Sequence, residues 1–207
     1  MVVIHFTAMQ GAQAALDRLC DPQAQVSAHY LIGADGTCWQ MVDEAARAWH
    51  AGAGQWGAVS DVNSRSIGIE LDNRGDHPFA ARQMRVLEDL LGGILSRWQI
   101  SPQRVIGHAD MAPGRKADPG PRFDWRRLAR QGLSVWPETS AHHNTSPDAQ
   151  RALGTALHGF GYATPPDCAP DDAVLAAFRA RFGAFTSLAA AQDLAKRFPV
   201  DRANRSA

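Results

Sequence analysis

Short apolar runs along the chain predict strands at residues 2–6, 29–32, 37–42, 66–71 and 105–107. The first run, VVIHF, is rich in β-branched residues and fits a buried strand. An Ala-Asp-Gly segment separates the second run from the third. Because Asp and Gly supply turn geometry, these two runs are predicted to form a hairpin.

Apolar positions that recur every three to four residues predict helices between and after these strands. The longest spans residues 80–98, and shorter ones are expected over 11–20 and from an N-cap at Asp124 to residue 131. Residues 108–121 hold several Pro and Gly and are expected to be irregular. Strands that alternate with helices, together with one hairpin, predict an α/β fold, with a mixed central β-sheet flanked by helices.

The character of the chain changes near residue 137. Residues 138–147 are polar and end in a proline, which is typical of a linker. Residues 148–207 carry three short amphipathic stripes and predict a small helical domain. So small a bundle buries little surface, and we expect it to dock on the larger domain at 1–137 or on a ligand.

The composition of the chain excludes several classes of protein. Lys and Arg total 21, as do Asp and Glu, so the net charge is zero and the chain lacks the basic excess of a nucleic-acid coat. Hydrophobic residues make up 45% and charged residues 20%, which suits a globular protein with a sizeable core. No stretch approaches the length of apolar residues that spans a membrane, so a membrane is not an expected partner. Because the net charge is zero, nucleic acid is not an expected partner either.

The three cysteines and the N-terminus bear on the cellular compartment. Cys20, Cys38 and Cys168 are odd in number and far apart, which excludes a disulfide framework and a cysteine zinc site and predicts free, mostly buried thiols. The N-terminal MVVIHFTAM lacks the basic and apolar regions of a signal peptide. We therefore expect a cytoplasmic protein, or a periplasmic one if the natural chain begins upstream with an export signal.

Two histidines stand at apolar strands. His5 lies inside VVIHF and His108 directly follows VIG, where burial without a partner would be costly. Each taken alone fits a hydrogen-bonded core histidine better than a ligand. Asp118 lies in a Pro/Gly segment after His108, and two histidines with one carboxylate form a catalytic zinc set that leaves a fourth position for water. The alternative for Asp118 is turn formation, because Asp-Pro-Gly is a common turn.

An open zinc site also needs a base and an oxyanion donor. Strand alternation in SIGIEL places Glu70 on the face opposite Ile69, pointing to a cleft or to water. Lys116 precedes Asp118 by two residues, which puts both on one side of an extended segment. A solvated strand Glu and a surface Lys are the better readings of each residue alone, but together they complete the set.

The same residues carry a resemblance to a known family. Five ordered blocks, within about residues 1 to 137, resemble the zinc-dependent N-acetylmuramoyl-L-alanine amidases, a superfamily that includes peptidoglycan recognition proteins. The blocks are VIHFTAM, VSAHYLIGADGT, AWHAG, NSRSIGIELDN and VIGHADMAPGRKADPG.

The resemblance implies a role for each of the five residues. It implies that His5, His108 and Asp118 bind one zinc ion per chain, that Glu70 is the catalytic glutamate and that Lys116 stabilises the transition state. The implied reaction is hydrolysis of the amide between N-acetylmuramic acid, or its 1,6-anhydro form, and L-alanine in peptidoglycan fragments. The implied setting is bacterial cell-wall degradation and muropeptide recycling.

Further residues in the matching blocks are candidates for substrate binding. Trp49 and His50 begin a long loop, and Arg115 is suited to a stem-peptide carboxylate because a guanidinium pairs well with one. His29 is as fit for the core of the hairpin as for supporting the site. The tail at 148–207 is similar to a peptidoglycan-binding module.

Two other hypotheses remain open at this point. One is a non-catalytic peptidoglycan-recognition protein on the same fold. The other is a purely structural metal site, which is normally closed by four protein ligands.

Overall fold

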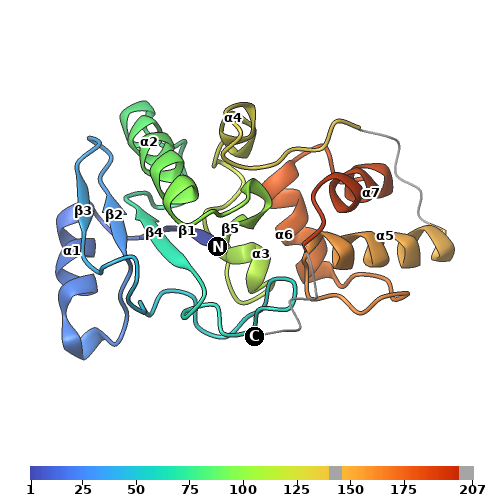
Figure 1. Ribbon diagram of the computed structural model, residues 1–207, viewed down its shortest axis with the longest axis horizontal. Helices are drawn as coiled ribbons and strands as arrows, with labels where there is room; N and C mark the ends of the chain where they lie inside the picture. The colour runs from blue at the N-terminus through green and yellow to red at the C-terminus, as the bar shows by residue number, and fades with distance from the viewer. Residues whose placement is uncertain (140–145, 201–207) are drawn as a thin grey trace.

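A five-stranded mixed sheet lies between helices in one part of the molecule, and the C-terminal helices occupy the other part (Figure 1). The computed structural model describes residues 1–139 and 146–200. The strands are β1 (Val2–Phe6), β2 (Tyr30–Ile32), β3 (Cys38–Gln40), β4 (Ile67–Leu71) and β5 (Val105–Gly107), in the order β3-β2-β4-β1-β5. β1 runs parallel to β4 and β5, β2 runs parallel to β4, and β2 and β3 form the antiparallel hairpin. The predicted α/β fold with a mixed sheet is confirmed.

The helices follow the predicted pattern with one exception. They are α1 (Ala12–Cys20), α2 (Ala81–Arg97), α3 (His108–Met111), α4 (Trp125–Arg130), α5 (Pro147–Phe160), α6 (Asp172–Phe182) and α7 (Leu188–Arg197). Asp124 caps α4 as expected, because its carboxylate accepts a hydrogen bond from the Arg127 amide. The prediction of irregular backbone at 108–111 is wrong. A helical turn forms there because the Asp110 carboxylate accepts from the Gly107 amide at 2.8 Å.

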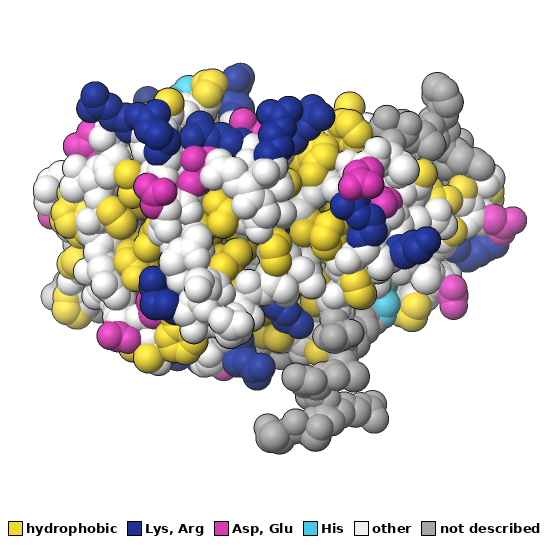
Figure 2. All heavy atoms as spheres, turned by 45° about the horizontal axis from the view of Figure 1, so that its top comes forward, with side chains coloured by type: hydrophobic (Ala, Val, Ile, Leu, Met, Phe, Trp, Pro, Cys, Tyr) yellow, Lys and Arg dark blue, Asp and Glu magenta, His cyan; other side chains and the backbone are white. Residues whose placement is uncertain are grey.

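The two faces of the sheet have different coverings. Side chains of Val2, Ile4 and Ile69 lie on one face and pack with α2 and with residues around α4. Lys and Arg side chains gather along the edge of the molecule where α2 and α4 lie (Figure 2). Val3 and His5 alternate with those apolar residues and lie on the opposite face. That second face carries the functional site.

The C-terminal segment forms the three predicted helices, α5, α6 and α7, which stand at the β5 end of the sheet (Figure 1). Their apolar stripes do not make a separate core. Phe160, Phe178 and Phe182 belong to one buried cluster with Val3 and Ile106 of the sheet. The expected docking on the larger domain is therefore observed. Most of the expected linker, residues 140–145, lies outside the described residues.

The structure tests two predictions from composition, on the state of the cysteines and on membrane spans. The three cysteines are free, as predicted, but they are exposed, so the expectation of buried thiols is wrong. Cys20 ends α1, Cys38 lies on the edge strand β3, and Cys168 lies in the loop before α6, and none of these places offers a core to fill. In residues 1–139 and 146–200, no helix combines the length and hydrophobicity that crossing a bilayer requires.

Candidate metal and catalytic site

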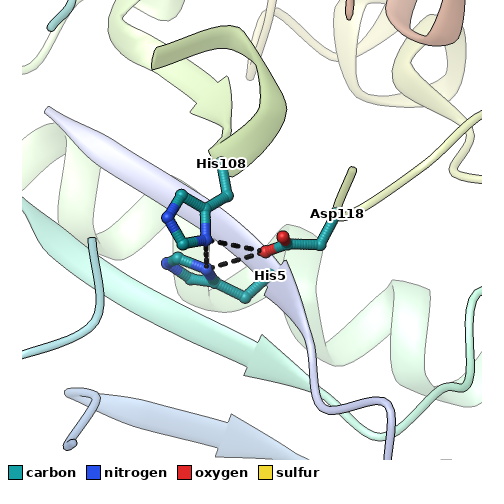
Figure 3. A group of neighbouring side chains, drawn as sticks. All are labelled: His5, His108 and Asp118. Atoms are coloured by element: carbon teal, nitrogen blue, oxygen red, sulfur yellow. Dashed lines mark hydrogen bonds and ion pairs between the residues drawn. The ribbon is translucent and has the colours of Figure 1, made fainter. Parts of the chain in front are cut away.

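Three side chains from separate segments converge at the carboxyl ends of β1 and β5 (Figure 3). His5 lies on β1, His108 opens α3 directly after β5, and Asp118 lies in the following loop. Because β1 and β5 are parallel neighbours, both histidines reach the same edge of the sheet. The two Nδ1 atoms are 2.9 Å apart, and Asp118 Oδ2 lies 2.9 Å from the first and 3.1 Å from the second.

The chemistry of these three groups fits a zinc ion. All three side chains are buried, and their ligand atoms lie within 4.8 Å of one another. Burial, and next the charge of His108, lower the pKa of His5 to about 4, which keeps the imidazole in its neutral, metal-binding form. Burial alone would raise the pKa of Asp118, but hydrogen bonds with His108 and His5 lower it well below its usual range. Two neutral imidazoles and one carboxylate are the ligands of many catalytic zinc sites.

The outer nitrogen atoms of both histidines are also held in place. In a metal-bound state His108 Nδ1 would carry no proton, and the proton of the neutral ring would lie on Nε2, which is 2.8 Å from the Ala51 carbonyl oxygen and could donate to it. His5 Nε2 lies 3.0 Å from His50 Nδ1, and His50 Nε2 lies 3.2 Å from Ser66 Oγ. The supporting roles of the Ala51 carbonyl and Ser66 were not predicted. A backbone carbonyl has no sequence signal, and a serine next to a strand, as Ser66 is next to β4, is common.

Glu70 stands beside this cluster. It lies on β4 directly opposite His5 in the β1–β4 register, and both side chains face the same side of the sheet. Burial, and next the Asp118 carboxylate, raise the pKa of Glu70 to about 8, while the positive charge of Lys116 opposes the rise. Glu70 Oε2 is buried and has no hydrogen-bond partner in the described part of the chain. A carboxyl group in this setting is suited to exchange a proton with a molecule in the cleft.

A cleft of about 630 Å³ opens over the cluster. Among its lining residues are most of the predicted site residues: His5, Trp49, His50, Glu70, His108, Arg115, Lys116 and Asp118. Lys116 is exposed at the rim. The three expected ligands, the expected base and the expected cation are therefore brought together in one cavity, although only spacing and resemblance linked them in the sequence.

The candidates for substrate contact differ in how free they are. The Trp49 side chain is 59% exposed, with the Arg47 guanidinium 5.2 Å from its ring centre. Arg115 donates to the carbonyl oxygens of Ala51 and Ala53, so part of its guanidinium already holds the loop. His50 lines the cleft but is also hydrogen-bonded to His5. Substrate contact by these residues stays a prediction.

His29 is corrected by the structure. It is fully buried and is not among the residues that line the cleft. Its Nδ1 accepts from the Gly68 amide at 3.0 Å and its Nε2 lies 3.1 Å from the Ala46 carbonyl oxygen. Both ring nitrogens therefore join backbone segments around the hairpin, which is the core role, and no polar atom of the ring is left for a substrate.

Comparison with known proteins links this site to a family. A family model described as N-acetylmuramoyl-L-alanine amidase matches residues 1–121. The chain is 37% identical to the N-acetylmuramoyl-L-alanine amidase AmiD of Escherichia coli over 209 positions, which cover 88% of this chain and 74% of AmiD. It is 41% identical to the 1,6-anhydro-N-acetylmuramyl-L-alanine amidase AmpD of Haemophilus influenzae over 106 positions, which cover 51% of this chain and 58% of AmpD.

Solved structures give the same grouping. The complex of E. coli AmiD with the substrate anhydro-N-acetylmuramic acid-L-Ala-D-gamma-Glu-L-Lys superposes with a TM-score of 0.85 at 34% identity and covers 96% of this chain and 89% of that chain. AmpDh3 from Pseudomonas aeruginosa superposes with a TM-score of 0.81 at 29% identity and covers 97% and 92%. Both matches extend well beyond residue 121, so the similarity includes the C-terminal helices as well as the sheet.

Proposed function

Because the chain belongs to the N-acetylmuramoyl-L-alanine amidase family, we propose that it hydrolyses the amide bond between N-acetylmuramic acid and L-alanine in peptidoglycan fragments. The observation that carries the proposal is the convergence of His5, His108 and Asp118 in a cleft that also contains Glu70 and Lys116. A binding protein would need the cleft, but it would not need a buried carboxyl group with a raised pKa beside three metal ligands.

We propose that His5, His108 and Asp118 hold one zinc ion. When bound, zinc supplies Lewis acidity, which polarises a carbonyl group and lowers the pKa of water. With these three ligands from the described part of the chain, a bound ion would keep a position for substrate or water, unlike a structural site closed by four protein ligands. Lys116 favours the ionised form of Glu70, and a bound divalent cation would act in the same direction.

The protein side chains then divide the reaction between them. Glu70 accepts a proton from a water molecule as the water oxygen attacks the amide carbonyl carbon. The Lys116 ammonium, at the rim of the same cleft, stabilises the negative charge that develops on the carbonyl oxygen. Glu70 returns the proton to the alanine nitrogen as the carbon–nitrogen bond breaks. The products are a lactyl carboxylate on the sugar and a peptide with a free amino terminus.

The substrate proposed is a small muropeptide, including the 1,6-anhydro form. The similar AmiD structure is a complex with the substrate anhydro-N-acetylmuramic acid-L-Ala-D-gamma-Glu-L-Lys, and AmpD is a 1,6-anhydro-N-acetylmuramyl-L-alanine amidase. The exposed ring of Trp49 offers an apolar surface at the cleft, and Arg115 offers a cation to a peptide carboxylate. A cleft of about 630 Å³ is within the usual range for small-ligand sites.

The test compares the wild-type chain with Glu70→Gln on defined anhydro and reducing-end muropeptides, with products identified by mass spectrometry. Glu88→Gln is the matched control, because Glu88 lies on α2, away from the cleft, and pairs with Arg127. Wild type and Glu88→Gln are expected to release the peptide, whereas Glu70→Gln should be slower by about 10² to 10⁴ with its zinc content unchanged. Muropeptide binding without turnover by the zinc-loaded wild type would instead support a recognition protein.

A further inference from the structure

The shortest helix of the site carries one of its metal ligands. α3 is a single turn, His108–Met111, and His108 is its first residue. An isolated turn has almost no stability of its own, because helix nucleation is unfavourable. The direction of the His108 ring therefore depends on the contacts that stabilise α3 on its side away from the cleft.

Asp110 is the point at which α3 is held. Its Oδ2 accepts from the Gly107 amide at 2.8 Å and from Arg181 Nη1 at 2.8 Å, and its Oδ1 accepts from the Tyr162 hydroxyl at 2.5 Å. Asp110 is 2% exposed, Arg181 3% and Tyr162 0%. Gly107 adjoins the ligand His108, whereas Tyr162 follows α5 and Arg181 lies on α6. A single buried carboxylate thus joins the turn that carries a metal ligand to the C-terminal helices.

Arg181 also grips the strand that leads into this turn. Its Nη2 donates to the Val105 carbonyl oxygen on β5 at 3.0 Å and to Ser134 Oγ at 3.4 Å. The guanidinium is 4.6 Å from the ring centre of Trp125 and 5.1 Å from that of Phe182. Its hydrogen bonds therefore hold the β5–α3 segment at Val105 and at Asp110, and the contacts with the Trp125 and Phe182 rings limit the movement of the guanidinium.

The energetics of a buried ion pair favour a positioning role over a stabilising one. Removing both charges from water costs about as much as their attraction returns, so such pairs add little net stability compared with apolar residues. What an arginine with fixed partners does supply is a rigid geometry, because its planar fork fits only one arrangement of acceptors. The position of α3, and with it His108, is the geometry at stake here.

We infer that Tyr162 and Arg181 are positioning residues for the metal site, which act on His108 through Asp110. The inference rests on the proposed function, since it takes the three converging side chains as zinc ligands. It gives the C-terminal helices a part in metal binding that does not require them to touch peptidoglycan. Tyr162 and Arg181 neither line the cleft nor belong to the His5, His108 and Asp118 cluster, so neither is a catalytic residue.

The first test pairs Tyr162→Phe with Ser187→Ala in the full chain. Each variant loses one hydroxyl group and one hydrogen bond in the C-terminal segment, but Ser187 caps α7 through the Ala190 amide and is not bonded to Asp110. We expect Tyr162→Phe to raise the zinc dissociation constant on the order of tenfold, measured by competition with a chromophoric chelator. Ser187→Ala should leave that constant unchanged even where it lowers the melting temperature equally. Equal zinc affinities for wild type and Tyr162→Phe would overturn the inference.

The second test compares the zinc affinities of two variants of Arg181. Arg181→Lys keeps a charge for Asp110 but loses the planar fork, so its zinc affinity should fall between those of wild type and Arg181→Met. If Arg181→Met does not fold, Arg181→Lys and Tyr162→Phe still decide the matter. A zinc-loaded wild type that leaves muropeptides intact would contradict the proposed function, whereas an active wild type with Tyr162→Phe and Arg181→Lys variants of unchanged zinc affinity would contradict only this inference.

Discussion

Replacing Phe178 with alanine should destabilise the sheet and the C-terminal helices together. Phe178 lies on α6 and is fully buried. Its ring meets Tyr162 edge-on at 6.0 Å and lies tilted against Phe182 at 5.0 Å. Truncating a buried Phe to Ala typically costs about 3 to 5 kcal/mol, to which each aromatic contact contributes about 0.5 to 1.5 kcal/mol. We expect a loss of about 4 kcal/mol from a total free energy of unfolding of about 5 to 15 kcal/mol.

This loss of stability should affect both the sheet and the C-terminal helices, because they share one buried cluster. The buried cluster that contains Phe178 also contains Val3 of β1 and Ile106 of β5. A cavity in this cluster removes contacts from both parts of the molecule at once. The two parts should therefore unfold in one transition, with the denaturant midpoint lowered and the slope unchanged.

Leu87→Ala provides the comparison. Leu87 is fully buried on α2, in the cluster on the other face of the sheet, and its truncation should cost about 2 to 5 kcal/mol. Hydrogen exchange of β1 and α5 amides in increasing denaturant reads the two parts separately. Each variant is expected to lower protection of both segments. If Phe178→Ala affected only α5 and Leu87→Ala only β1, the reasoning would be refuted, and the C-terminal helices would be an independent domain.

Three further predictions concern charged and polar side chains. Lys116→Ala should lower kcat by about 10² to 10³ with zinc content unchanged, in steady-state assays on a muropeptide. A hydrogen bond from Arg97 lowers the pKa of Glu44 from its ordinary 4.5 to about 2, with help from other hydrogen bonds and against the effect of burial. The ionised Glu44 therefore stabilises the fold at neutral pH, and this contribution is lost as the pH falls from about 4.5 towards 2. In urea denaturation, Glu44→Gln should therefore be less stable than wild type by about 1 to 2 kcal/mol at pH 7, and the difference should shrink at pH 3. His50→Ala should weaken zinc binding about tenfold by releasing the outer nitrogen of His5, whereas a change in KM alone would show that His50 serves the substrate.

Local patterns were sufficient to predict most of the sheet and its helices. The apolar runs at 2–6 and 66–71 became strands because burial of such runs dominates the local preference, and the hairpin formed where Asp and Gly supply the turn. The α3 turn was missed because local patterns do not include the tertiary contacts that stabilise it. Pro and Gly around it favour irregular backbone, and the Asp110 contacts that stabilise a turn come from tertiary structure.

In the site, too, the sequence can indicate which residues are buried and paired, but it cannot indicate which residues are their partners. His5 and His108 were selected because a polar group in an apolar run needs a partner, and Arg181 satisfies the same rule, since it lies two helical turns after Val174 on the apolar stripe that includes Phe178. Its partner Asp110 lies 71 positions earlier, and the chain offers 21 acidic residues. A pattern can therefore indicate that Arg181 is buried and paired, but only the docking of α6 against α3 selects Asp110. The amidase motifs end before α6, so helical spacing alone indicates Arg181, and no motif links this residue to the turn that carries His108.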